Sequence, residues 1–435
     1  MNLVKSKILF FFETAAGLGH MRRTSAIVNA LIKRGADVTV ASGSFQSPED
    51  FFDEGVNLLR LNPLIGRNGD VRYRFDEKGG KHTVLDYDED KWKKARNEIV
   101  KKFIKENPVH AIIAEYWPFS RQSSFNGAIR TAVKWNHKAG IDPVIISSAR
   151  DILHTKIADG KEDKKTRSQE ERAIRVIREM VDYILVHGDP RIVRFEEGFS
   201  NFDKIKKIVE YTGFVVSEIE RLPKDQREKK VIVSVGAGTV GKPILQAVFN
   251  AQSLIEDLKN HKWVYVLGPR MIDAHRSSLV SQFDRYNSSV SEKQRIEYHD
   301  YITNLPQLLG TSDFSISMGG YNTTFEVLAS GIQGAIIPKL IKEGPDKFSS
   351  CPEQAGRARR LQTQGLVSFI EGTEISDPKN LAKLLLQAFR RSTTVPSVNF
   401  DGASKTADLV LDKIWRRFKN TPIPDFPKIE RSLVD

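Results

Sequence analysis

The segment Met318-Gly319-Gly320-Tyr321-Asn322-Thr323-Thr324-Phe325-Glu326 is the most informative stretch of the chain, because it joins an expected strand to an expected helix. Residues 314–317 form the expected strand, and the expected helix ends near Ser330-Gly331. Glycines at such a junction leave the backbone N–H groups of the helix start open, and these groups can bind phosphate. The sequence therefore predicts an anion-binding turn at Gly319 and Gly320.

Glu326 lies about one turn inside the same expected helix. A carboxylate in that position can accept two hydrogen bonds from a vicinal diol such as ribose. A structural alternative stays open, in which Asn322 or Thr323 only caps the helix and Glu326 completes a capping box.

Short β-branched runs alternate with helical stretches on both sides of this segment, which is typical of parallel sheets with crossover helices. The first series of expected strands covers residues 7–12, 37–41, 56–61, 110–115, 143–147, 183–187 and 207–211. The second series covers residues 231–235, 263–267, 295–298, 314–317, 334–338 and 367–370. Between the strands at 143–147 and 183–187 we expect a helix that starts with a capping box formed by Ser168 and Glu171.

A polar stretch at residues 218–230 separates the two series, and a chain of 435 residues exceeds the size of one hydrophobic core. We therefore predict an α/β protein with two similar parallel-sheet domains. The expected boundaries are 1–217 for the first domain and 218–402 for the second. Residues 403–435 form an amphipathic helix and a tail, which we expect to pack back on the first domain.

The composition favours a cytoplasmic protein with an anionic partner. Cys351 is the only cysteine, and no apolar run approaches the roughly 18 residues of a membrane span. The net charge is +12, but the positive residues occur in scattered pairs such as Lys93-Lys94. Aromatic residues do not alternate with these pairs as they do in single-strand-binding grooves. We therefore expect no nucleic acid partner.

Two further glycine-rich turns follow expected strands. Residues 16–20 end in His20 at the start of a helix expected at residues 21–34, where a histidine can take a proton from a hydroxyl group or merely cap the helix. Residues 236–242 contain Gly236, Gly238 and Thr239. This second turn lacks the acidic partner of a dinucleotide site, and Pro243 stands where a P-loop needs Ser or Thr. It is interpreted as a glycine turn that opens toward the cleft.

The order of these motifs resembles the donor site of GT-B glycosyltransferases. The run GGYNTTFE, the strand that ends at Pro338 and the pair Glu353-Gln354 are similar to the plant-type pattern CGWNS-x-x-E followed by Asp-Gln. The chain also resembles glycosyltransferase family 28, the family of the lipid-linked N-acetylglucosaminyltransferase of peptidoglycan synthesis. The glycine loop that ends in His20 and the pair Thr212-Gly213 carry this second resemblance. The resemblance implies a GT-B fold, with two Rossmann-like domains that face a central cleft.

The resemblance also implies roles for individual residues. The first domain would bind the acceptor and the second the nucleotide sugar, with the diphosphate near Gly319, the ribose at Glu326 and the sugar at Glu353. The full implied set of donor-binding residues is Gly17, Gly19, Gly236, Gly238, Thr239, Arg270, Tyr301, Ile302, Gly319, Gly320, Asn322, Thr323, Glu326, Glu353 and Gln354. Met318 departs from the pattern, because plant-type enzymes have a histidine there.

Inverting sugar transfer needs a base, and His20 and Glu115 are the candidates. Arg150 and Asp151 also lie where the cleft is expected, although Asp151 can simply pair with Arg150. We expect no cofactor and no metal, because helix dipoles can stabilise the leaving diphosphate. The triplet Asp86-x-Asp88-x-Asp90 is interpreted as a solvated helix start and not as a metal site.

The implied partners are a UDP-linked sugar, a glycan or lipid-linked acceptor and an anionic membrane surface. The implied location is cytoplasmic, peripheral at the inner face of a membrane. Residues 17–23 are also similar to the UDP-sugar hydrolase of pseudaminic acid synthesis, so a nucleotide-sugar hydrolase is the alternative enzyme. A non-catalytic sugar-nucleotide-binding protein is a third reading.

Overall fold

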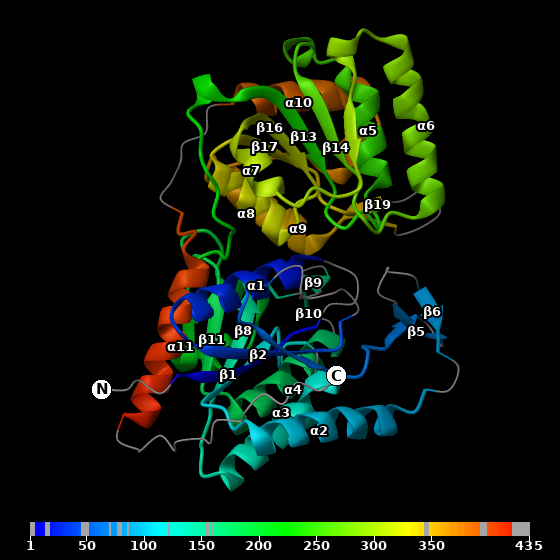
Figure 1. Ribbon diagram of the computed structural model, residues 1–435. Coiled ribbons are helices and arrows are strands. Elements are labelled where there is room, and N and C mark those ends of the chain that lie inside the picture. Colours follow the sequence, from blue (N-terminus) through cyan, green and yellow to red (C-terminus); the bar gives the residue numbers. More distant parts are fainter. Residues whose placement is uncertain are drawn as a thin grey trace.

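The chain folds into two α/β domains, each built on a parallel sheet (Figure 1). The computed structural model describes residues 5–13, 18–44, 52–68, 71–75, 81–84, 87–120, 122–153, 157–158, 161–162, 164–342, 348–391 and 398–419. The predicted fold class is confirmed: the two series of strands form two separate parallel sheets.

The first sheet has seven strands in the order β12-β11-β8-β7-β1-β2-β3. Their bounds are β1 Lys7–Phe11, β2 Asp37–Ser42, β3 Asn57–Arg60, β7 Ala111–Glu115, β8 Val144–Arg150, β11 Tyr183–His187 and β12 Val209–Tyr211. The helices of this domain are α1 Leu18–Lys33, α2 Glu89–Glu106, α3 Gln122–Lys138 and α4 Lys164–Met180.

Both faces of the first sheet are covered, because alternate side chains of a strand point to opposite faces. In β1, Leu9 and Phe11 pack with apolar residues of α2, α3 and α4. Ile8 and Phe10 pack with residues of α1 and of the last described helix, α11 (Gly402–Phe418). Burial on both faces explains why these strands are continuous apolar runs.

The second sheet has the order β15-β14-β13-β16-β17-β20. Its strands are β13 Glu228–Ser234, β14 Lys262–Val266, β15 Glu297–His299, β16 Ser312–Ser317, β17 Gln333–Ile336 and β20 Ser368–Phe369. Its helices are α5 Lys242–Gln252, α6 Asp273–Ser289, α7 Leu305–Gly310, α8 Tyr321–Ser330, α9 Pro352–Thr363 and α10 Pro378–Arg390.

Three small antiparallel sheets were not predicted. They are formed by β4 Gly66–Asn68 with β5 Val71–Phe75 and β6 Lys81–Thr83, by β9 Ile157–Ala158 with β10 Lys161–Glu162, and by β18 Leu340–Lys342 with β19 Phe348–Ser350. Their strands have two to five residues, too short for a pattern of alternating polarity to stand out. Figure 1 shows β5 and β6 set off from the first parallel sheet.

The expected capping box of α4 is wrong. The helix begins at Lys164, so Ser168 lies inside it, and the Ser168 hydroxyl accepts a hydrogen bond from Arg172 at 2.9 Å. By contrast, Asp88 does cap α2, because its side chain accepts from the backbone N–H groups of Asp90 and Lys91. That contact confirms the interpretation of Asp88 as part of a helix start. Asp86 lies outside the described residues.

The chain passes between the domains twice, and the two passages pair with each other. Val215 and Asp401 form an antiparallel bridge, and the Phe214 N–H donates to the Asn399 carbonyl at 2.8 Å. After the second passage α11 runs beside α1 (Figure 1), where Val410 and Ile414 join the core of the first domain. The helix that ends the described chain is therefore part of the domain in which the chain begins.

Replacing Ile414 with Ala tests this packing. Ile414 is 3% exposed, so we expect the free energy of unfolding of the first domain to fall by about 2–5 kcal/mol through the cavity left behind. Chemical denaturation followed by circular dichroism measures it. Trp415→Ala is the matched control, because Trp415 is 59% exposed and its loss should cost less than about 0.5 kcal/mol. Equal effects of the two variants would contradict the packing of α11.

Candidate functional site

A cavity of about 260 Å³ lies between the two domains. Its walls come from the start of α1 and the end of β8 in the first domain, and from the loops after β13, β15 and β16 in the second. The lining residues that the sequence predicted are Gly19, His20, Gly236, Tyr301, Ile302, Gly320, Asn322 and Thr323. Ligands of open parallel sheets bind at such a place, beyond the carboxyl ends of the strands.

The start of α8 forms one wall of the cavity. Gly319 has φ +69°, and a Cβ atom there would lie 2.7 Å from the side chain of Ile336, so only glycine fits this turn. Gly320 is the N-cap residue and supplies no side-chain cap. Asn322 and Thr323 are not caps either: the Asn322 amide donates across the domain interface to the Gly19 carbonyl at 3.1 Å. The first N–H groups of α8 are thus open to an anion.

Glu326 lies on α8 behind this wall and is buried. One carboxylate oxygen accepts a hydrogen bond from Arg22 Nη1 at 3.4 Å, and the other has no partner among the described residues. Burial raises the pKa of Glu326, and Arg22 opposes this shift. A buried oxygen without a partner is costly. Two hydroxyl groups of a ligand would remove that cost.

His20 and Glu115 face the cavity from the first domain as a hydrogen-bonded pair. Glu115 Oε1 is 2.8 Å from His20 Nδ1 and also accepts a hydrogen bond from Arg23. Burial would raise the pKa of Glu115, but His20 and Arg23 outweigh it and lower the pKa to about 2. The carboxylate can only accept, so Nδ1 of His20 carries the proton.

Burial lowers the pKa of His20, although Glu115 raises it in part. The neutral form of the ring therefore predominates at pH 7, and Nε2 has no hydrogen-bond partner among the described residues. This tautomer is that of a general base whose orientation is set by a carboxylate.

Four charged residues form a buried network across the interface, next to the cavity. Arg357 of α9 binds both carboxylate oxygens of Asp151, at 2.7 and 3.0 Å, and also donates to Glu353 at 2.9 Å. Arg150 is 3.3 Å from the same Glu353 oxygen, and its guanidinium lies over the Tyr116 ring at 4.6 Å. The expected pairing of Asp151 with Arg150 is replaced by the bidentate contact with Arg357.

The other predicted residues lie around the cavity without lining it. Gly238 adopts φ +88° in close contact with the backbone of Leu267 and Gly268, and Thr239 is exposed. The Arg270 N–H donates to the Ala237 carbonyl at 2.9 Å. Gln354 accepts a hydrogen bond from the Lys339 N–H at 2.7 Å. Gly17 lies outside the described residues.

Sequence reasoning missed Arg22, Arg23 and Arg357 as parts of the site. Arg22 and Arg23 directly follow the glycine loop and His20, so basic residues in the first turns of that helix were the available signal. Arg357 stands four residues after Glu353, the spacing of an ion pair on one helix face.

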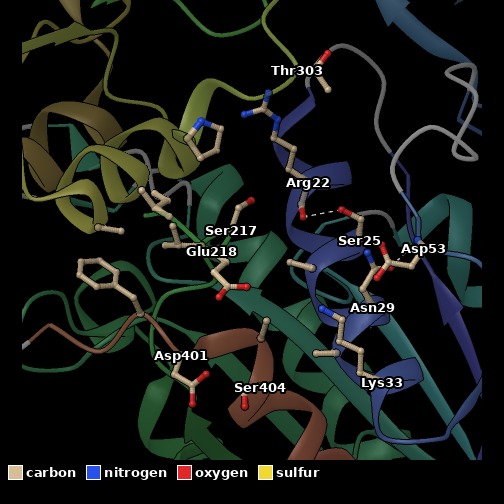
Figure 2. A pocket seen from close by; sticks show the side chains of 18 of the residues that line it. Arg22, Ser25, Asn29, Lys33, Asp53, Ser217, Glu218, Thr303, Asp401 and Ser404 are labelled. Carbon is tan, nitrogen blue, oxygen red and sulfur yellow. Dashed lines mark hydrogen bonds between the residues drawn. The ribbon is translucent and has the colours of Figure 1, made fainter. Parts of the chain in front are cut away.

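A second cavity of about 1050 Å³ lies on the other side of Arg22 (Figure 2). Figure 2 shows Ser25, Asn29 and Lys33 along α1 on one side. Ser217 and Glu218 of the interdomain passage lie with Asp401 and Ser404 on the other. Arg22 and Tyr301 line both cavities, and Arg22 Nη2 donates to the Tyr301 hydroxyl at 3.2 Å. This pair therefore separates the two cavities.

Within the described ranges, no three His, Cys, Asp or Glu side chains gather in the manner of a metal site. None of the helices described combines the length and apolar character that crossing a membrane requires.

The two facing parallel-sheet domains define a protein of the GT-B fold class. The structure is similar to the calicheamicin glycosyltransferase CalG4, with a TM-score of 0.56 and 12% identity over 97% of this chain and 100% of that one. It is also similar to MurG of Acinetobacter baumannii, with a TM-score of 0.51 and 13% identity over 95% of this chain and 100% of that one.

The sequence adds a family to the fold. Residues 231–408 match the glycosyltransferase family 28 C-terminal domain, so the second domain is similar to the C-terminal domains of that family. A Bacillus cereus UDP-N-acetylglucosamine--N-acetylmuramyl-(pentapeptide) pyrophosphoryl-undecaprenol N-acetylglucosamine transferase is 28% identical over 196 residues. That match covers 42% of this chain and 48% of the relative, so the chain spans about half the length of the curated relatives it matches.

Removing the cross-domain ion pair tests the network. Arg357→Met leaves Asp151 buried without a partner, so we expect the free energy of unfolding to fall by about 3–5 kcal/mol. Chemical denaturation measures it. Arg359→Gln on the same helix removes the surface pair with Glu371 and a contact with the face of the Phe369 ring, and should cost less than about 1 kcal/mol. A small effect of Arg357→Met would contradict the role of this pair in joining the domains.

Proposed function

We propose that this protein is a glycosyltransferase that transfers a sugar from a UDP-linked donor to an acceptor hydroxyl group. The observation that carries the proposal is the composition of the smaller cavity. The open start of α8 lies on its second-domain side, and the neutral His20 paired with Glu115 lies on its first-domain side. The family 28 match of the second domain supports the same activity.

In the proposed complex the second domain binds the donor. The diphosphate lies at the N–H groups that follow Gly319 and Gly320, where the helix dipole favours negative charge. The unpartnered oxygen of Glu326 accepts from the ribose hydroxyls. The uracil base of the donor lies near Tyr301 and Ile302. The residues near the sugar include Gln354, whose amide nitrogen is not used by the contact with Lys339.

The reaction is a direct displacement at the anomeric carbon. His20 Nε2 takes the proton of the acceptor hydroxyl as its oxygen forms the new bond to the sugar. The bond between the sugar and the diphosphate breaks on the opposite face, so the configuration inverts. Glu115 stabilises the imidazolium that forms, and the start of α8 stabilises the departing diphosphate, without a metal ion.

The acceptor in this proposal is a glycan or a lipid-linked glycan. The supporting observation is that the Bacillus cereus relative is named for transfer to a pyrophosphoryl-undecaprenol acceptor. The net charge of +12 suits a peripheral position at the cytoplasmic face of an anionic membrane, where each basic residue near the surface adds roughly 1 kcal/mol of attraction.

A thermal-shift panel of UDP-, GDP- and dTDP-linked sugars tests the donor. We expect stabilisation by UDP-linked sugars, because a ligand at 100 times its dissociation constant adds about 2.7 kcal/mol to folding. The absence of a shift with every nucleotide sugar would overturn the proposal. Release of free sugar at full rate without any acceptor would point to a hydrolase instead.

Removal of the base tests the mechanism. His20→Ala should lower kcat by roughly 10²- to 10⁴-fold while donor affinity stays close to that of the wild type, because His20 acts on the acceptor hydroxyl. Steady-state kinetics and a binding titration separate the two effects. His137→Ala, on the exposed end of α3, is the control and should keep the wild-type rate. An unchanged kcat in His20→Ala would exclude His20 as the base.

The pH dependence of kcat provides a separate test. Burial lowers the folded-state pKa of His20 below 6.5, so the base form dominates at neutral pH and the rate falls only as pH drops through that lower pKa. Glu115→Gln removes the negative charge that raises the pKa of His20, so the acid limb should move to still lower pH while the maximal rate falls. If the fall in rate at low pH moved to higher pH in Glu115→Gln, the pairing of His20 with Glu115 would be contradicted.

A further inference from the structure

Arg22 is the arginine of the cavity wall that contacts Glu326, the residue to which the proposed function assigns the donor ribose. It lies in the second turn of α1, and its side chain crosses the domain interface to Glu326 and Tyr301. The side chain is 17% exposed and lines both cavities, so it can be reached from the donor side. The contact with Glu326 is long, at 3.4 Å.

The other arginines near the cavity pair with carboxylates other than Glu326. Arg23 is paired with Glu115, Arg150 with Glu353, and Arg357 with Asp151. Arg22 differs because its carboxylate partner is Glu326, which the proposed function assigns to the ribose hydroxyls. When the ribose binds Glu326, the Arg22 guanidinium stays charged and largely buried, but it shares the Glu326 carboxylate with two hydroxyl groups.

The nearest negative charge that arrives with the donor is its diphosphate. The hydrogen bond from Asn322 to the Gly19 carbonyl holds the first turn of α1 against the first turn of α8. An anion bound at the start of α8 is therefore close to α1. Arg22 follows Gly19 by three residues in α1, so the two residues are neighbours on the helix surface. A guanidinium can bind phosphate oxygens in bidentate fashion.

We propose that Arg22 binds a phosphate of the donor, so that the diphosphate is held between the start of α8 and a guanidinium from the first domain. This role rests on the proposed function and deepens it. It makes Arg22 a binding residue for the nucleoside diphosphate and distinguishes it from an arginine that only joins the domains. Because the positive charge lies beside the leaving group, it also stabilises the charge that develops there.

The test is a ligand series on the full chain, with uridine, UMP and UDP titrated by NMR, which measures millimolar dissociation constants. Arg22→Gln should weaken UDP roughly 10- to 100-fold and uridine less than about threefold, because uridine has no phosphate. Arg22→Lys keeps the charge and should recover part of the UDP affinity. Arg34→Gln, just beyond the end of α1, is the control and should bind all three ligands as the wild type does.

The ratio of uridine to UDP affinity within one variant is independent of any general loss of folded protein. An equal loss for uridine and UDP would show that Arg22 only positions Glu326, and unchanged affinities would show that it does not contact the donor. Both results overturn the role of Arg22 and leave the donor assignment standing. A wild-type protein that binds no UDP would overturn the UDP donor and the role of Arg22 together.

Discussion

The buried contact between Asp151 and Arg357 constrains how the two domains face each other, and the smaller cavity lies between the domains in that arrangement. Both side chains are removed from water, which is costly for two charges. The cost is offset by two short hydrogen bonds and by the further contact of Arg357 with Glu353. A change in the relative position of the domains would break this geometry, so the contact favours the arrangement in which His20 and the start of α8 line one cavity.

Four of the polar contacts across the interface illustrate two different roles. Those of Arg357 with Asp151, and of the Tyr321 hydroxyl with the His187 carbonyl at 2.7 Å, join fully buried groups. Those of Arg22 with Glu326, and of Asn322 with Gly19, involve groups that a phosphate or a sugar could equally bind. The first kind keeps the domains together, whereas the second keeps the groups proposed to bind the donor hydrogen-bonded.

The sheets were predictable because buried parallel strands are continuous apolar runs. The predicted strand ends agree best with the structure where charged residues or glycine flank the strand. The strand at Tyr183–His187 agrees at both ends, since charged residues precede it and Gly188-Asp189 follow it. The glycine turn before α8 was predictable for the same local reason. Ion pairs between residues far apart in the sequence produce no local sequence pattern from which they could be predicted. Nothing near Glu353 indicates that it pairs with Arg150, some two hundred residues earlier, so its assignment to the donor sugar came from resemblance alone.

The position of α11 has a consequence for synthesis of the protein. Ile27, Val28 and Leu31 of α1 share a core cluster with Val410, Ile414 and Phe418, which are made nearly four hundred residues later. During translation the emerging first half therefore presents an apolar helix face to the surrounding medium while the second half is being made. The second domain can complete its own sheet by residue 391, before that face is covered. A chain released after residue 391 but before α11 would have a complete second domain and an uncovered apolar face on the first, a form suited to capture by chaperones.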